Sequence, residues 1–124
     1  MEINVLLVDD EKELADHMAE RLISRGLAVT AVYDGESAIR FVKENTVDVM
    51  VLDLIMPGMD GLQTLREVKK IRPDIHVLML TGHGTIDTAM EGKKEGASEY
   101  LIKPCDIIQL TSLIKDTCKA ASNG

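Results

Sequence analysis

Side chains that can do chemistry stand directly after short apolar runs of this 124-residue sequence. They are carboxylates, a hydroxyl and an ammonium, with one glycine among them. The residues are Asp9, Asp10, Glu11, Asp53, Thr81, Gly82 and Lys103. Clustered carboxylates repel one another, and a charge at the end of an apolar segment is costly to bury without a partner. A set of this composition therefore needs cations, and it suits the transfer of a phosphoryl group to a carboxylate.

A divalent metal would balance these acids. Hard carboxylate oxygens without a neighbouring His or Cys favour Mg²⁺ over zinc. Asp10 and Asp53 are the predicted direct ligands, with the backbone carbonyl of Ile55 and water molecules completing the octahedron. Lys103 adds one further positive charge.

Asp53 is the predicted nucleophile toward phosphorus. The metal, Lys103, the Thr81 hydroxyl and the Gly82 amide would then hold the phosphoryl oxygens as charge develops. Each residue alone has a plainer interpretation. Asp10 with Glu13 fits the cap of a helix, Asp53 fits a turn, and Lys103 fits a solvated surface lysine.

Five apolar runs supply the strands that would position these groups, and helical spacing fills the segments between them. The runs cover residues 3–8, 27–32, 47–52, 75–80 and 99–102. Strands alternating with helices predict an α/β fold, a flavodoxin-like (βα)5 doubly wound parallel sheet with strand order 2-1-3-4-5. Ligands bind such sheets at the carboxyl ends of the strands, where the reactive residues stand. The helix near 86–94 carries Gly92 in its interior, at a cost of about 1 kcal/mol, and is expected to be the least stable.

Composition limits the remaining possibilities. The net charge of −7 argues against direct binding to nucleic acid, which needs a basic surface. No apolar run approaches the ~20 residues that span a bilayer, so we expect no membrane association and a cytoplasmic location. Size and the absence of a linker predict one domain over 1–121 with a tail at 122–124.

Four motifs also resemble a known family. LLVDDE, VLDLIMPGMDG, LTGHG and YLIKP are similar, in order and spacing, to the receiver domains of two-component response regulators, of the chemotaxis-regulator-like superfamily. The resemblance implies that Asp53 accepts a phosphoryl group from the phosphohistidine of a sensor histidine kinase or from a phosphotransfer protein. It also implies that the chain catalyses its own phosphorylation and dephosphorylation, and that Asp9 assists the metal through water.

The resemblance further implies a conformational switch. Thr81 would move toward the phosphoryl group, and Tyr100 would swing inward into the space that it leaves. The output face would comprise the helix near 86–94, the strand at 99–102 and the helix from 106 onward, with a homodimer forming on phosphorylation. Ile55 and His83 are candidate modulators of phosphoryl lifetime, because both lie next to motif residues and differ from the commoner pattern.

Two other functions remain open on the residues alone. A haloacid-dehalogenase-like phosphohydrolase also uses a strand-end aspartate, but that family has a second acid two residues later, where this chain has Ile55. A flavodoxin-like binder of flavin phosphate needs a small-residue loop after the first strand. Here that loop is the acidic DDEKE, and the chain holds only two tyrosines and one phenylalanine to stack on a flavin.

Overall fold

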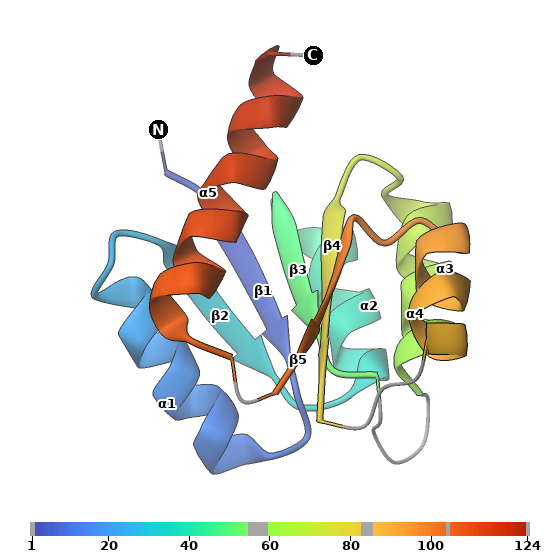
Figure 1. Ribbon diagram of the computed structural model, residues 1–124, viewed down its shortest axis with the longest axis horizontal. Helices are drawn as coiled ribbons and strands as arrows, with labels where there is room; N and C mark the ends of the chain where they lie inside the picture. The colour runs from blue at the N-terminus through green and yellow to red at the C-terminus, as the bar shows by residue number, and fades with distance from the viewer. Residues whose placement is uncertain (1, 55–59, 83–85, 104, 124) are drawn as a thin grey trace.

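Five parallel strands form one sheet in the order β2-β1-β3-β4-β5 in a computed structural model of the chain (Figure 1). The strands are β1 (Asn4–Val8), β2 (Ala28–Val32), β3 (Val49–Leu52), β4 (His76–Thr81) and β5 (Glu99–Ile102). The helices are α1 (Lys12–Ile23), α2 (Gly35–Glu44), α3 (Gly61–Ile71), α4 (Ile86–Lys94) and α5 (Ile107–Asn123). The structure describes residues 2–54, 60–82, 86–103 and 105–123, apart from the side chains of 81, 86–88 and 120–123. The predicted fold class and strand order are confirmed.

Helices cover both faces of the sheet and bury the side chains at its centre. α1 and α5 lie on one face, and α2, α3 and α4 lie on the other. Successive side chains of a strand point to opposite faces, so Leu6 and Val8 pack toward α2 and α3 while Val5 and Leu7 pack toward α1 and α5. All of β3 is buried, which explains why its sequence is uniformly apolar.

Two helix starts are fixed by aspartates. The side chain of Asp60 accepts a hydrogen bond from the Gln63 amide at 2.8 Å, as its predicted role as a cap requires. Asp34 caps α2 in the same way. α1 differs, because it begins after Glu11 with no side-chain hydrogen bond at its cap. The capping interpretation of Asp10 is therefore not supported.

Gly92 has a packing role that the sequence did not reveal. A Cβ at this position would lie within 3.0 Å of the sulfur and terminal methyl of Met79, a fully buried residue of β4. The missing side chain lets α4 approach the sheet over Met79. Gly92 thus allows close packing in addition to lowering helix propensity. The low stability of α4 remains a prediction.

α5 is longer than the sequence suggested. It continues through Asn123, where a fading helix and a tail were expected, because no proline or glycine interrupts the chain before Gly124. The domain boundary at 121 remains a prediction. Among the described residues, no helix is both long and apolar enough to cross a membrane.

Candidate functional site

Backbone hydrogen bonds extend the sheet by one residue past two central strands and place an aspartate at each end. The Asp9 amide donates to the carbonyl of Val32 at 3.2 Å, and the Asp53 amide donates to the carbonyl of Val8 at 2.9 Å. Both carboxylates are therefore fixed at the same edge of the sheet, which is the edge that the strand order predicts for a ligand site.

Asp9, Asp10 and Asp53 form a compact acidic cluster. Their carboxylate oxygens lie within 4.8 Å of one another. Asp9 and Asp53 are buried, with 3% and 6% of their surface exposed, whereas Asp10 is more exposed. Buried carboxylates this close together need positive charge nearby. The donor set is oxygen alone, which fits Mg²⁺ and does not favour zinc.

Lys103 reaches this cluster from the end of β5. Its Nζ lies 2.6 Å from Asp9 Oδ2, 3.4 Å from Asp53 Oδ2 and 3.7 Å from Glu11 Oε1. Burial by itself lowers the pKa of the ammonium, but the hydrogen bond from Lys103 to Asp9 and the charges of Asp9 and Asp53 outweigh it and raise the pKa. Lys103 is therefore a protonated counter-ion of the site.

Asp9 is held more firmly than the sequence indicated. Its Oδ1 accepts a hydrogen bond from the Glu11 amide at 2.9 Å, and its Oδ2 accepts one from Lys103. The sequence identified Lys103 as the partner of Asp53, whereas the shorter contact is with Asp9. The missed signal was that Asp9 directly follows four consecutive apolar residues of β1, where a carboxylate is buried and needs a donor.

The structure describes only some of the other predicted site residues. Gly82 lies beside the first side-chain carbon of Lys103, since a Cβ on Gly82 would be 3.9 Å from Lys103 Cβ. Thr81 ends β4, but its side chain lies outside the described part of the chain, as do Ile55 and His83 entirely. The predicted metal carbonyl and the two modulators therefore lie outside the described residues.

Tyr100 already has its hydroxyl buried. Its ring packs against the core cluster that contains its strand neighbour Met79. Within the described residues the hydroxyl has no hydrogen-bond partner, and burial raises the pKa of the phenol. The hydroxyl is thus enclosed in this structure, and the inward swing of Tyr100 on phosphorylation remains a prediction.

Gly61 is a site residue that sequence reasoning missed. A Cβ on Gly61 would lie 2.5 Å from the carbonyl oxygen of Asp53 and 2.9 Å from the carbonyl carbon of Leu54. Its amide donates to the Leu54 carbonyl at 2.9 Å. Only glycine lets the start of α3 close down on the backbone that carries Asp53. The pair Asp60-Gly61 before a helical pattern was the available signal.

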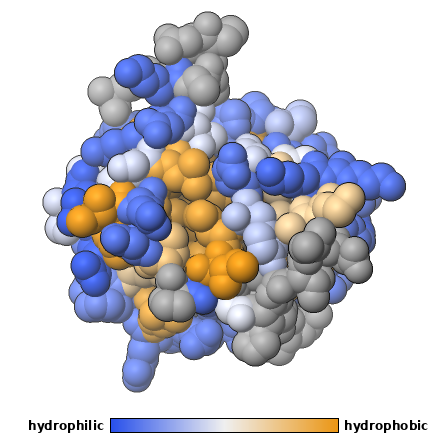
Figure 2. Space-filling model, in the orientation of Figure 1, coloured by the Kyte–Doolittle hydropathy of each residue, from blue (hydrophilic) through white to orange (hydrophobic). Residues whose placement is uncertain are grey.

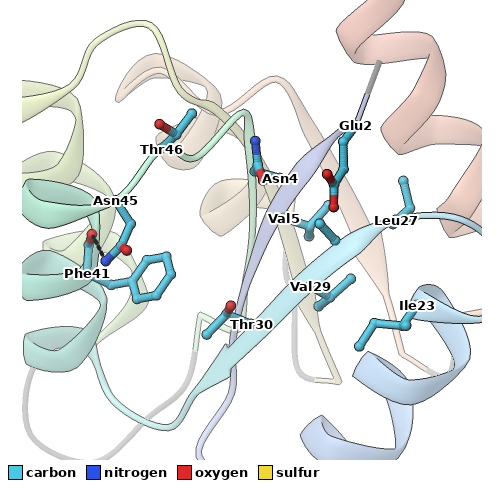
Figure 3. A pocket seen from close by; sticks show the side chains of 11 residues that line it. Glu2, Asn4, Val5, Ile23, Leu27, Val29, Thr30, Phe41, Asn45 and Thr46 are labelled. Atoms are coloured by element: carbon cyan, nitrogen blue, oxygen red, sulfur yellow. Dashed lines mark hydrogen bonds between the residues drawn. The ribbon is translucent and has the colours of Figure 1, made fainter.

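Another hollow lies away from these residues. Its volume is about 520 Å³, and it is bordered by the starts of β1 and β2 and by the C-terminal ends of α1 and α2 (Figure 3). Of the described residues that line it, Glu2 alone is ionisable. This hollow is at the opposite end of the strands from the acidic cluster.

A family model provides the identification. The model of the response regulator receiver domain matches residues 5–115. The chain belongs to this family. Receiver domains are the signalling phosphoacceptors of two-component systems, and they typically bind Mg²⁺ at an aspartate cluster such as the one in this chain. They interact with histidine kinases and with output domains. Neither the match nor the relatives support the phosphohydrolase alternative.

Relatives of this receiver domain are longer proteins. It is 38% identical over 112 residues to the transcriptional regulatory protein ZraR of Klebsiella oxytoca, covering 89% of this chain and 25% of that protein. It is 34% identical over 116 residues to the regulatory protein LuxO of Vibrio vulnificus, covering 94% of this chain and 26% of LuxO. The chain thus spans about a quarter of the length of these relatives.

A solved structure from Burkholderia pseudomallei is also similar. It is a response regulator with a phosphorylated aspartic acid, a calcium ion and citrate. The two chains superpose with a TM-score of 0.86 at 26% identity, over 98% of this chain and 71% of the other.

Proposed function

We propose that Asp53 is the phosphoacceptor of this receiver domain, and that it takes a phosphoryl group from the phosphohistidine of a sensor histidine kinase or of a phosphotransfer protein. The observation that supports this most is the position of Asp53. It is a buried carboxylate at the end of the central strand, 3.4 Å from the Lys103 ammonium and clustered with two further aspartates.

In the proposed reaction an Asp53 carboxylate oxygen attacks phosphorus. The new O–P bond forms as the P–N bond to the donor imidazole breaks, and the imidazole retains the electron pair of that bond. Lys103 would turn from the carboxylates toward the new phosphoryl oxygens, with the Thr81 hydroxyl and the Gly82 amide beside it. Hydrolysis by water would return the aspartate and release inorganic phosphate, and the domain would catalyse both steps itself.

Mg²⁺ would be held by Asp10, Asp53 and the Ile55 carbonyl, with Asp9 acting through water. When bound, it supplies positive charge that offsets the acidic cluster and the incoming phosphoryl group. The contacts of Asp9 support this division, because both of its oxygens already accept hydrogen bonds from Glu11 and Lys103. Asp10 is more exposed and better placed to coordinate directly.

Output would pass through the face formed by α4, β5 and α5. Thr81 and Tyr100 would form the switch, and Ile55 and His83 would influence the lifetime of the phosphoryl group. Figure 2 shows apolar side chains gathered where Figure 1 draws α5 and β5. Ile102 of β5 is 61% exposed and Ile108 of α5 is 56% exposed. Such exposed residues suit contact with an output domain or with a second copy of the chain. A cytoplasmic location and a domain spanning 1–121 complete the proposal.

The test is phosphorylation by acetyl phosphate in the presence of Mg²⁺, followed by intact mass measurement. We expect the wild type to gain one phosphoryl group and Asp53→Asn to gain none. Asp60→Asn is the matched control, since it removes an exposed acid a few residues away and keeps a side chain that can cap α3. An unmodified wild type, or an equal adduct on Asp53→Asn, would refute the assignment. Multiple turnover of phosphate monoesters would instead favour the phosphohydrolase.

A further inference from the structure

Three side chains at the rim of the site form a contact that the proposed chemistry does not use. Tyr33 directly follows β2, and its hydroxyl donates a hydrogen bond to Asp16 of α1. The ammonium of Lys12, the first residue of α1, lies 5.3 Å from the centre of the Tyr33 ring. A cation at this distance from an aromatic face is attracted by the ring.

The backbone places this cluster beside the acidic site. Val32, which precedes Tyr33, accepts the hydrogen bond from the Asp9 amide at 3.2 Å. Lys12 stands two residues after Asp10 in the sequence. The cluster therefore flanks the β1–α1 turn that carries two of the three clustered aspartates.

The hydrogen bond of Asp16 leaves Lys12 without a direct ion pair within the described part of the chain. Lys12 and Asp16 are four residues apart on a helix, where opposite charges ordinarily pair. Here Asp16 accepts from the phenol instead, and among the described residues Lys12 forms no ion pair. The same hydrogen bond, together with burial and the charge of Asp16, raises the pKa of Tyr33, so the phenol keeps its proton.

An exposed, unpaired cation matters at this position because the site repels its substrate. A phosphodonor is an anion, and it approaches the carboxylates of Asp9, Asp10, Glu11 and Asp53. Lys103 is already shared by three of these four acids. A rim charge that offsets such a field raises the rate of encounter, and its effect weakens with salt.

We propose that Lys12, kept unpaired over the Tyr33 ring, is the rim cation that draws anionic phosphodonors to Asp53. Tyr33 is a positioning residue, because its ring lies under the Lys12 ammonium and its hydroxyl engages Asp16, which keeps Asp16 out of a direct ion pair with Lys12. This inference rests on the proposed phosphorylation of Asp53 and adds a determinant of donor preference to it.

The first test compares two donors of different charge. Acetyl phosphate is a dianion near neutral pH, and phosphoramidate is a monoanion. At low ionic strength, with Mg²⁺ present, we expect Lys12→Gln to lower the second-order rate constant for acetyl phosphate about three- to fivefold, which corresponds to a unit charge acting on a dianion at ~10 Å in water. The loss for phosphoramidate should be about twofold, and both losses should largely disappear in high salt. Lys43→Gln, an exposed charge in the last turn of α2, is the matched control and should change neither rate.

The second test concerns Asp16. Tyr33→Phe keeps the ring but removes the hydroxyl, so Asp16 becomes free to pair with Lys12. The rate with acetyl phosphate should then fall, but by less than in Lys12→Gln, because both charges are still present. In an Asp16→Asn background the same Tyr33→Phe change should leave the rate unaltered, since no carboxylate is left to pair with Lys12. A purely structural role of the Tyr33 hydroxyl would give the same loss in both backgrounds.

The outcomes separate this inference from the proposed function. A wild-type rate for Lys12→Gln at low salt, equal losses for the two donors, or an equal loss from Tyr33→Phe with and without Asp16→Asn would overturn the role of Lys12 while Asp53 remained the acceptor. A wild type that takes no phosphoryl group from either donor would instead refute the acceptor assignment.

Discussion

At the scale of single residues, Lys103 is shared between the acids of the site. Its ammonium lies 2.6 Å from Asp9 and 3.4 Å from Asp53, so Asp9 holds the lysine beside the proposed acceptor.

Gly61 offers a prediction at the same scale. In Gly61→Ala the new methyl group would meet the backbone of Asp53 and Leu54, which cannot move aside as a flexible side chain can. We expect the free energy of unfolding in urea to fall by about 1–3 kcal/mol, as for other overpacked sites, and phosphorylation of Asp53 to slow.

Gly82→Ala is the comparison for stability, since its methyl group would come no closer than 3.9 Å to its nearest neighbour, Lys103 Cβ. It should unfold close to the wild type. A Gly61→Ala protein as stable as Gly82→Ala would show that α3 can move away from Asp53 without cost.

At the scale of elements, α4 is fitted to one side chain of the sheet. Gly92 lies over Met79, and Met79 pairs in register with Tyr100 on the neighbouring strand. Met79 therefore links α4 to the proposed switch residue, Tyr100. The Tyr100 hydroxyl is buried and has no hydrogen-bond partner among the described residues, which costs about 1–3 kcal/mol, so a movement that gives it a partner or exposes it to water is favoured.

Two opposing effects decide the outcome of Gly92→Ala. Alanine favours the helix by about 1 kcal/mol, but overpacking against Met79 costs about 1–3 kcal/mol. We expect Gly92→Ala to destabilise the wild type and to stabilise a Met79→Val background, which lacks the sulfur and terminal methyl of the contact. Urea unfolding of the four proteins of this cycle measures the coupling. The same sign in both backgrounds would mean that the contact with Met79 is not the reason for the glycine.

At the scale of the whole molecule, the two ends of the sheet differ in chemistry. The carboxyl ends of the strands carry the acids and Lys103, while the opposite end has the hollow of Figure 3 with Glu2 as its ionisable lining residue. Exposed apolar side chains lie between these ends, on α4, β5 and α5, and are represented by Met90, Ile102 and Ile108. A signal formed at one edge would thus be read on an adjacent face.

This surface carries the last prediction. If phosphorylation promotes pairing of two copies through β5 and its neighbours, Ile102→Thr should weaken the dimer by about 1 kcal/mol or more, because a buried branched side chain is worth roughly 1.5–3 kcal/mol. Sedimentation velocity of the phosphorylated protein measures this. Ile23→Thr is the matched control, since Ile23 is 51% exposed on α1, away from that face. Equal effects of the two variants would place the contact elsewhere.

The fold and the type of site can be inferred from the sequence alone. Five apolar runs separated by helical segments admit few topologies, and topology alone brings Asp53, Asp10 and Lys103 to one edge of the sheet. These inferences depend on local patterns and on which strand each residue follows, and both can be read along the chain.

Which atoms meet depends on how the elements pack. That Lys103 lies closest to Asp9, that Gly61 admits α3 against Asp53, that Gly92 accommodates Met79 and that Tyr33 occupies Asp16 all depend on distances between different elements or their ends. Periodicity shows which face a side chain joins, but the choice among several nearby partners depends on a few tenths of an ångström of packing. No sequence pattern carries that information, because it arises only when the strands and helices are packed together.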